Sequence, residues 1–223
     1  MNSRLFIQAL TKFLAGLLLV GLLLFVPAGT FAYPQAWLLI GILFVPMFIA
    51  GFVLMFKSPD LLQKRLQARE EQDEQKTVIL LSGVMFLAAF LAAGLSFRFG
   101  RLMLPVSFSY AAAVVFLFAY VLYAEVLREN AYLSRTIEVQ ENQTVVDTGL
   151  YGVVRHPMYM STLLLFLSMP LVLGSVISFV IMLAYIPIIV KRIRNEEAVL
   201  AEGLEGYNEY MERVRYRVIP FVW

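Results

Sequence analysis

The chain of 223 residues contains no cysteine, a single histidine and few charged residues. Without cysteine it can form neither disulfides nor thiolate nucleophiles, and cysteine-rich zinc sites are excluded, although the redox compartment stays undetermined. One histidine argues against a metal centre built on histidines, so we expect no metal. Charged residues make up 15% and hydrophobic residues 61% of the chain. This balance is typical of an integral membrane protein, and we expect no nucleic-acid partner.

Four uncharged apolar stretches precede the first long polar loop. The first charge-free run is interrupted by the turn sequence PAGTFAYP (27–34), which divides it into two spans. The next two stretches are joined by the short sequence RFGR, which predicts an antiparallel hairpin. The predicted spans are residues 5 or 13 to 26, 35–56, 77–97 and 102–124.

The apolar stretch 157–190 is too long for one simple crossing. Its 34 uncharged residues would form a helix of roughly 50 Å, against a hydrocarbon core of about 30 Å. Two short helices, broken near Pro170, Gly174 and Ser175, fit this stretch better. The alternative is one tilted, proline-kinked helix with an interfacial extension. We therefore expect an all-α polytopic membrane protein with about six transmembrane helices, five being possible.

The distribution of lysine and arginine favours the even number of spans. With both termini in the cytoplasm, sixteen of the 18 basic residues lie on the cytoplasmic side, and only Arg98 and Arg101 lie outside. An odd number would place the six basic residues after Val190 on the outer side. A basic start, an apolar run and the sequence 30–32 also loosely resemble a signal peptide, but the first span pairs naturally with the second.

Three polar segments have patterns of their own. Leucines at helical spacing in the loop 58–76 predict a short helix on the membrane surface. The sequence RTIEVQ (135–140) alternates polar and apolar residues and predicts an extended segment. A narrow apolar stripe in 203–223 predicts an amphipathic interfacial helix that docks on the membrane or on other loops and is ended by Pro220.

The segment GLYGVVRHPMY (149–159) holds the only histidine, His156. Pro157 suits the first turn of a helix, so Arg155 and His156 lie at a helix start, where unpaired N–H groups favour an anion such as a carboxylate. Tyr159 adds a hydroxyl within the next turn. A lone histidine at a membrane boundary is also compatible with a simple hydrogen-bonded interfacial residue.

A second polar cluster, KRIRNEEAVL (191–200), follows the last apolar stretch. Arg192 and Glu196 are four residues apart and share one helix face, with Glu197 about 100° around the helix. An exposed ion pair explains this spacing as well as a site does. Position favours a site, because these charges emerge from a membrane helix on the same side as His156, where low dielectric strengthens charge interactions.

The sequence TVVDTGLYGVVRHPMYMS (144–161), followed by RIRNEEAVLAEGLEGYNEYMERVRYRVIP (192–220), resembles the isoprenylcysteine carboxyl methyltransferase and phospholipid methyltransferase superfamily. Its signature is an RHPxY element and a later Glu-Glu pair. SPDLLQKRL (58–66) also resembles the corresponding loop of bacterial members. Ser161 stands where many members have glycine, and the Gly-x-Gly element of the phospholipid methyltransferases is not found, which counts against that branch.

The resemblance implies a four-helix transmembrane region over 1–125 and a methyltransferase region over 126–223 that binds S-adenosylmethionine from the cytoplasmic side. It implies that Arg192 faces the substrate carboxylate as the catalytic residue, and we expect Arg155 and Glu197 to support the site. The implied cofactor contacts are Gln143, Thr144, Val145, Val146, Tyr151, His156, Pro157, Met158, Tyr159 and Glu196.

Residue chemistry agrees with a carboxylate acceptor. A carboxylate is already ionised at neutral pH, so the protein has chiefly to align it and exclude water, and the planar fork of Arg192 suits that task. An amine or thiol must first lose a proton, for which only Glu197 and Tyr159 are nearby, and neither is a persuasive base. We therefore expect O-methylation of a prenylated or lipidic acceptor that arrives from the bilayer, ahead of phospholipid N-methylation or thiol S-methylation.

Two other classes of protein stay open. Sterol reductases resemble this family in their C-terminal half but use NADPH, and the short chain and the lack of a basic cluster beyond 191–194 argue against them. A non-enzymatic scaffold or transporter would need polar residues within the spans, and few are present. The short loops resemble bacterial members, so we expect a bacterial cytoplasmic membrane protein among membrane lipids, with both termini cytoplasmic. The acceptor and the oligomeric state cannot be deduced from the sequence.

Overall fold

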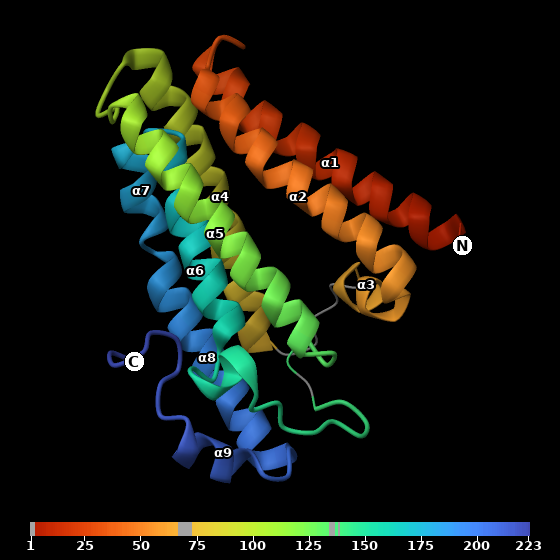
Figure 1. Cartoon of the computed structure of the whole chain (residues 1–223). Coiled ribbons are helices and arrows are strands. Elements are labelled where there is room, and N and C mark those ends of the chain that lie inside the picture. Colours follow the sequence, from red (N-terminus) through yellow and green to blue (C-terminus); the bar gives the residue numbers. More distant parts are fainter. Residues whose placement is uncertain (1–2, 67–72, 134–136, 138) are drawn as a thin grey trace.

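The computed structural model describes residues 3–66, 73–133, 137 and 139–223. Within these ranges all regular elements are helices, and an isolated bridge between Met103 and Ser175 is the one β-type pairing. The predicted all-α class is therefore confirmed. The elements, shown in Figure 1, are α1 (Ser3–Ala28), α2 (Pro34–Lys57), α3 (Pro59–Leu66), α4 (Asp73–Phe99), α5 (Val106–Glu129), the 3₁₀ helix η1 (Gly149–Gly152), α6 (Pro157–Val172), α7 (Val176–Met182), α8 (Tyr185–Gly203) and α9 (Tyr207–Arg213).

Proline and glycine set several of the helix boundaries. α2 and α6 each begin with a proline, Pro34 and Pro157, at the position where a missing N–H costs nothing. α1 ends before Gly29, whose φ of 69° is left-handed and whose N–H donates to the carbonyl oxygen of Phe25 at 3.0 Å. These residues interrupt the apolar runs where the sequence predicted a turn.

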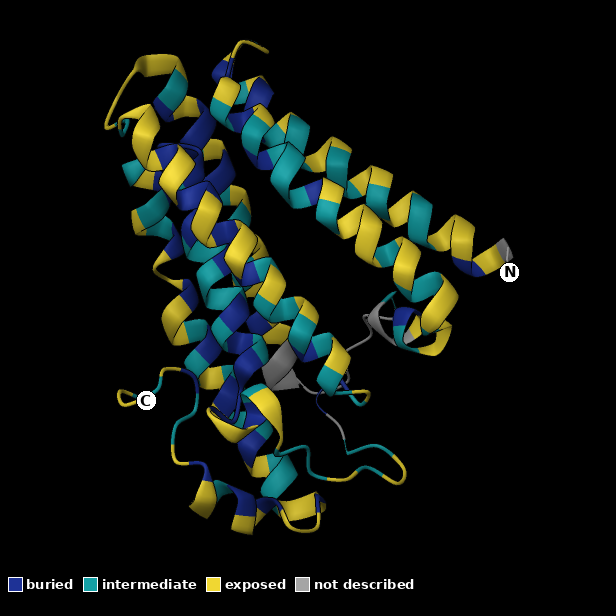
Figure 2. Ribbon diagram, viewed as in Figure 1, coloured by how far each residue is buried: buried dark blue, intermediate teal, exposed yellow. Residues whose placement is uncertain are grey.

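Five helical segments are long and apolar enough to cross a membrane: α1, α2, α4, α5 and the continuous stretch of α7 and α8. α6 is apolar but has 16 residues, about 24 Å of helix. Exposed residues cover the outer faces of the bundle in Figure 2. Many of them are large and apolar; Leu18, Val114 and Val121 are each more than 60% exposed. Such continuous apolar surface suits lipid, and the chain is a polytopic membrane protein.

The chain reverses direction between α6 and α7, around Gly174, whose φ is 73°. The carbonyl oxygen of Gly174 accepts a hydrogen bond from the N–H of Leu104 in the α4–α5 turn at 2.8 Å. The hydroxyl of Tyr33, just before α2, donates to the carbonyl oxygen of Leu173 at 2.7 Å. All three turns therefore meet at one end of the bundle (Figure 1). The predicted break is confirmed, and the single kinked helix is wrong.

The α1–α2 hairpin packs on the rest of the bundle mainly near its turn. The buried residues of this contact come from the end of α1, such as Leu24 and Phe25, and from the start of α2, such as Ala36 and Leu39. Farther along, the hydroxyl of Tyr120 in α5 donates to the backbone of Leu43 at 2.8 Å. Beyond that bond α2 is largely exposed, so the hairpin is anchored close to the turns.

Gly94 allows α4 to approach α1 closely. A Cβ atom at this position would lie 2.6 Å from the carbonyl oxygen of Leu24 and 3.2 Å from the backbone nitrogen of Ala28. Both of these atoms belong to the backbone of α1, so a larger side chain forces the two helices apart. We expect Gly94→Ala to destabilise the protein by about 1–3 kcal/mol, measured by thermal unfolding in detergent.

Gly83→Ala is the matched control for this substitution. Gly83 lies in the same helix, and no heavy atom lies within 4 Å of a Cβ placed there. This change should be neutral or stabilising by up to about 1 kcal/mol, because alanine is the better helix former. Equal melting temperatures for the two variants would show that the α1–α4 contact does not require glycine.

The polar elements lie at the end of the bundle opposite the three turns (Figure 1). α3 confirms the helix predicted in the loop 58–76, although 67–72 lies outside the described residues. Half of the extended segment predicted at 135–140, namely residues 135, 136 and 138, also lies outside them.

The C-terminal helix is shorter than predicted. α9 ends at Arg213 and not at Pro220, and Gly206, with φ of 81°, separates it from α8. Its buried side packs against Val139 and Val145 of the loop before η1. The apolar stripe therefore docks on protein, one of the two alternatives that the sequence left open.

Candidate active site

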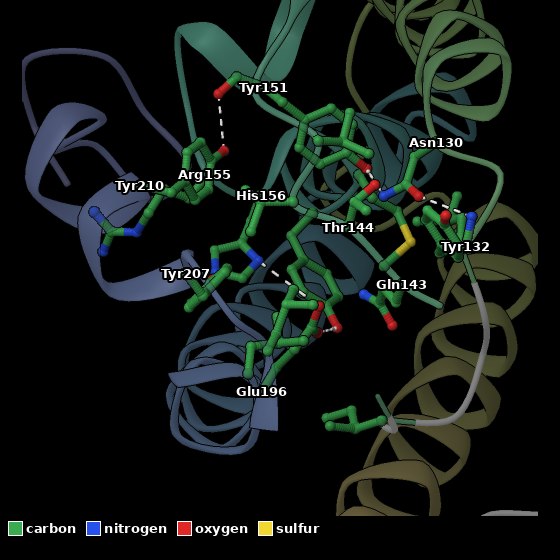
Figure 3. Close-up of a pocket in the computed structure, with 18 of the residues that line it drawn as sticks. Asn130, Tyr132, Gln143, Thr144, Tyr151, Arg155, His156, Glu196, Tyr207 and Tyr210 are labelled. Carbon is green, nitrogen blue, oxygen red and sulfur yellow. Dashed lines mark hydrogen bonds and ion pairs between the residues drawn. The ribbon is translucent and has the colours of Figure 1, made fainter. Parts of the chain in front are cut away.

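A cavity lies where the loop after α5, η1, the start of α6, α8 and α9 meet (Figure 3). Both polar clusters singled out in the sequence contribute to its wall: His156 and Tyr159 from the first, Arg192 and Glu196 from the second. They come together because α6 and the α7–α8 stretch run in opposite directions. The cavity is thus a product of the turn around Gly174.

His156 is the residue immediately before α6, and Pro157 is the first helical residue, as predicted. The backbone N–H groups of Arg155 and His156 are nevertheless not available to an anion. They donate to the carbonyl oxygens of Tyr216 and Arg217, at 2.9 and 2.8 Å. The prediction of free donors is therefore wrong for these two groups, because the irregular C-terminal tail pairs with them.

Glu197 binds three basic side chains in the interior. Its carboxylate accepts hydrogen bonds from Nε of Arg155 at 2.8 Å and from Nε of Arg217 at 2.7 Å, and it lies 3.2 Å from Nε2 of His156. Only 6% of the Arg155 side chain and 7% of that of Glu197 are exposed. Arg155 also donates to the backbone carbonyl of Val214 at 2.7 Å. The group fixes His156 and holds the C-terminal tail against α8.

The hydroxyl of Tyr159 connects the two sequence motifs. It donates to the carboxylate of Glu196 and accepts from Nε of Arg192 at 2.9 Å. Nδ1 of His156 lies 3.9 Å from the other oxygen of Glu196, so the imidazole stands between the two glutamates. Arg192 and Glu196, predicted to share a helix face, are therefore linked through Tyr159 at the cavity wall.

Tyrosines from other elements complete the cavity. The side-chain amide of Asn130 donates to the hydroxyl of Tyr151 at 2.9 Å, and the hydroxyl of Tyr210 donates to the backbone carbonyl of Tyr151 at 2.8 Å. Burial raises the pKa of Tyr151, Tyr207 and Tyr210 above the ordinary value. These phenols therefore stay protonated at physiological pH and act as neutral donors.

Nearly all residues that the sequence assigned to the cofactor line this one cavity: Gln143, Thr144, Val145, Val146, Tyr151, His156, Met158, Tyr159 and Glu196. Arg155 and Arg192 line it as well. Pro157 is buried at the start of α6, and Glu197 reaches the site through Arg155 and His156. The predicted residues thus form one contiguous group, while their roles toward a ligand stay predictions.

Several residues at the site were not predicted. The additional lining residues are Asn130, Tyr132, Leu133, Ile137, Leu200, Leu204, Tyr207 and Tyr210. Leu204 and Tyr207 belong to the apolar stripe interpreted as interfacial, and periodicity alone does not distinguish docking on a membrane from docking on a loop. Arg217 was counted only as one of the basic residues after the last span.

Two comparisons with known proteins bear on this region. Residues 110–202, from α5 to α8, match the isoprenylcysteine carboxyl methyltransferase (ICMT) family. A stretch of 91 residues is 32% identical to the Delta(14)-sterol reductase TM7SF2 of Mus musculus, and it covers 40% of this chain and 22% of that protein. The chain thus spans a minor part of this relative. Residues 110–202, which carry both motifs of the cavity, are thus similar to the ICMT family, as the sequence predicted.

Proposed function

We propose that the protein is a membrane methyltransferase that uses S-adenosylmethionine to methylate the carboxylate of a prenylated or other lipidic acceptor. The observation that carries this proposal is the meeting of the two motifs through Tyr159, Glu196 and Arg192 at one cavity of a membrane bundle. The family match over residues 110–202 supports the methyltransferase class.

The side chains of the cavity fit this cofactor. Its amino-acid end carries an ammonium, for which Glu196 offers a carboxylate, and a carboxylate, for which buried donors are present. Its nucleoside needs apolar contacts, which Leu200 and Leu204 offer. When bound, the cofactor supplies a methyl group on a positively charged sulfur. Buried polar atoms with an apolar wall are the usual composition of such a site.

Arg192 is the residue that we expect to orient the acceptor carboxylate. A guanidinium can bind a carboxylate through two parallel hydrogen bonds, and its Nε–H bond to Tyr159 fixes its direction. Methylation of a carboxylate replaces the sulfur–carbon bond by an ester bond and releases no proton. Alignment and exclusion of water, worth up to roughly 7–11 kcal/mol, therefore suffice without a general base.

The charge distribution supports a cytoplasmic orientation of the cavity. Arg98 and Arg101 flank the turn between α4 and α5, whereas the six basic residues after Val190 lie at the cavity end. Basic residues are enriched on the cytoplasmic side of membrane proteins. Both termini lie away from the three turns in Figure 1, which is consistent with the same orientation for both. A lipidic acceptor would then reach Arg192 from the surrounding bilayer.

Glu196→Gln tests the cofactor assignment. This change removes the negative charge but keeps the size of the side chain, and we expect the affinity for S-adenosylhomocysteine to fall by at least about tenfold. Calorimetric titration of the detergent-purified protein measures this loss. Glu202→Gln, on the exposed part of the same helix, is the matched control and should bind as the wild type does. Unchanged affinity of Glu196→Gln would contradict the role given to Glu196.

The identity with a sterol reductase over 91 residues favours one competing function, an NADPH-dependent reductase. Titration of the same preparation with NADPH separates the two candidates. Binding of NADPH without binding of S-adenosylhomocysteine would assign the cavity to a reductase. Binding of neither compound by the wild type would contradict both enzymes and favour a scaffold.

A further inference from the structure

Tyr207 is a buried tyrosine whose hydroxyl has no partner. The residue is 4% exposed, and its hydroxyl oxygen, closed off from solvent, has no hydrogen-bond partner among the residues that the structure describes. A buried donor without an acceptor lowers stability, and a phenylalanine would avoid this penalty. The hydroxyl therefore indicates a partner that is not part of the protein.

The contrast with the neighbouring tyrosines sharpens this point. Four other tyrosine hydroxyls that line the cavity are bonded to protein groups, those of Tyr132, Tyr151, Tyr159 and Tyr210. Among the cavity tyrosines in the described part of the chain, only Tyr207 has a hydroxyl without a hydrogen-bond partner. Burial by itself does not explain this difference, because Tyr159 and Tyr210 are equally buried.

The backbone fixes where the ring of Tyr207 lies. The left-handed conformation of Gly206 turns the chain into α9, and the N–H of Tyr207 donates to the carbonyl oxygen of Leu204 at 3.2 Å. The ring packs against Tyr210, with ring centroids 5.7 Å apart. Tyr207 is thus held at the cavity wall that it shares with His156 and Glu196 (Figure 3).

The nearby carboxylates are already engaged. Glu196 accepts from Tyr159, and Glu197 accepts from Arg155 and Arg217. Burial, followed by these two carboxylates, raises the pKa of Tyr207, so its hydroxyl stays protonated and donates. The missing partner is therefore an acceptor. Glu197 pairs with both Arg155, which lines the same cavity, and Arg217, so this group carries more positive than negative charge and favours an acceptor with negative charge.

We propose that the hydroxyl of Tyr207 donates a hydrogen bond to the carboxylate at the amino-acid end of the bound cofactor. The inference rests on the proposed function and adds a ligand-binding residue from α9, outside both motifs. Tyr207 would then hold the carboxylate, next to the excess positive charge of Arg155 and Arg217, while Glu196 holds the ammonium. A ligand that lacks this carboxylate would gain nothing from the hydroxyl.

Tyr207→Phe tests the proposal, because it removes only the hydroxyl. We expect its affinity for S-adenosylhomocysteine to fall by roughly ten- to a hundredfold. Its affinity for 5′-methylthioadenosine, which has the nucleoside and the sulfur but no carboxylate, should equal that of the wild type. The melting temperature without ligand should be unchanged or higher. Tyr210→Phe is the structural control, and it should lower that temperature because it loses its bond to Tyr151.

Three results would overturn the role of Tyr207: unchanged affinity for S-adenosylhomocysteine, equal losses for both ligands, or a lower melting temperature of ligand-free Tyr207→Phe. Equal losses of affinity for both ligands would show that Tyr207 contacts the nucleoside. A lower melting temperature of the ligand-free variant would show that its hydroxyl binds a group inside the protein. If the wild-type protein binds neither S-adenosylhomocysteine nor 5′-methylthioadenosine, the result contradicts the proposed function itself, on which the role of Tyr207 rests.

Discussion

Replacing Glu197 by alanine is expected to lower the melting temperature of the purified protein by on the order of 10 °C. The change leaves the buried guanidinium of Arg155 without its carboxylate and removes the acceptor of Arg217. Breaking a buried ion pair from one side costs about 3–5 kcal/mol, and each kcal/mol shifts the melting temperature of a protein of this size by about 2–4 °C. Thermal unfolding in detergent, followed by tryptophan fluorescence or calorimetry, measures the shift.

Glu202→Ala provides the comparison, because Glu202 is exposed on the same helix. Its effect should stay within about 0.5 kcal/mol. Adding Arg155→Met to Glu197→Ala should cost less than the two single changes together, since the double variant leaves fewer buried charges unpaired. Equal melting temperatures for Glu197→Ala and Glu202→Ala would show that the buried group does not stabilise the fold.

Gly149→Ala is the second change for which we expect a large effect. Gly149 has a φ of 50°, and a Cβ atom there would overlap the carboxylate of Glu129. That carboxylate accepts a hydrogen bond from the N–H of Leu150 at 3.1 Å. The carboxylate is the far end of a flexible side chain and can move aside, so the overlap costs chiefly this hydrogen bond, about 0.5–1.5 kcal/mol, which adds to left-handed strain of about 1–2 kcal/mol. Because Tyr151 of the cavity lies two residues later, affinity for S-adenosylhomocysteine should fall along with the melting temperature.

Gly100→Ala separates backbone strain from crowding. Gly100 has a similar φ of 61°, but no heavy atom lies within 4 Å of a Cβ placed there. It lies in the α4–α5 turn, at the opposite end of the bundle from the cavity. This variant should show the loss due to strain alone and bind ligand normally. If both variants lose the same stability, the close approach of Glu129 to Gly149 has no energetic consequence.

The helical part of the fold was predictable because membrane crossings require long charge-free runs with visible interruptions. Pro34 and Pro157 each begin a helix at the expected place, and Gly174 lies in the turn that the length of its run demanded. The RHPMY and NEE motifs were correctly expected to meet, since this turn brings the ends of their helices together. Helix boundaries could therefore be predicted from local sequence, and the meeting of the two motifs from the order and length of the apolar runs.

The C-terminal tail was not predictable in the same way. Tyr216 and Arg217 pair with Arg155 and His156 through backbone atoms, and such pairing leaves no periodicity in the sequence. Spacing within α8 likewise showed that Glu196 and Glu197 point in different directions, but not that Glu197 points inward. The partners of a buried charge come from distant segments, and a single sequence does not say which segments those are.

The α1–α2 hairpin is, in mechanical terms, a lever that pivots near the hydrogen bond between Tyr120 and Leu43. Lys12 of α1 donates to the carbonyl oxygen of Leu66, so α3 is connected to the free arm. The part of α2 beyond Phe44 is roughly 20 Å long, and a rotation of about 15° would displace Lys57 by roughly 5 Å. That is about half the spacing between packed helices. The free end of the hairpin, which faces the cytoplasm in the proposed orientation, can therefore shift relative to α5 while the bond between Tyr33 and Leu173 stays intact.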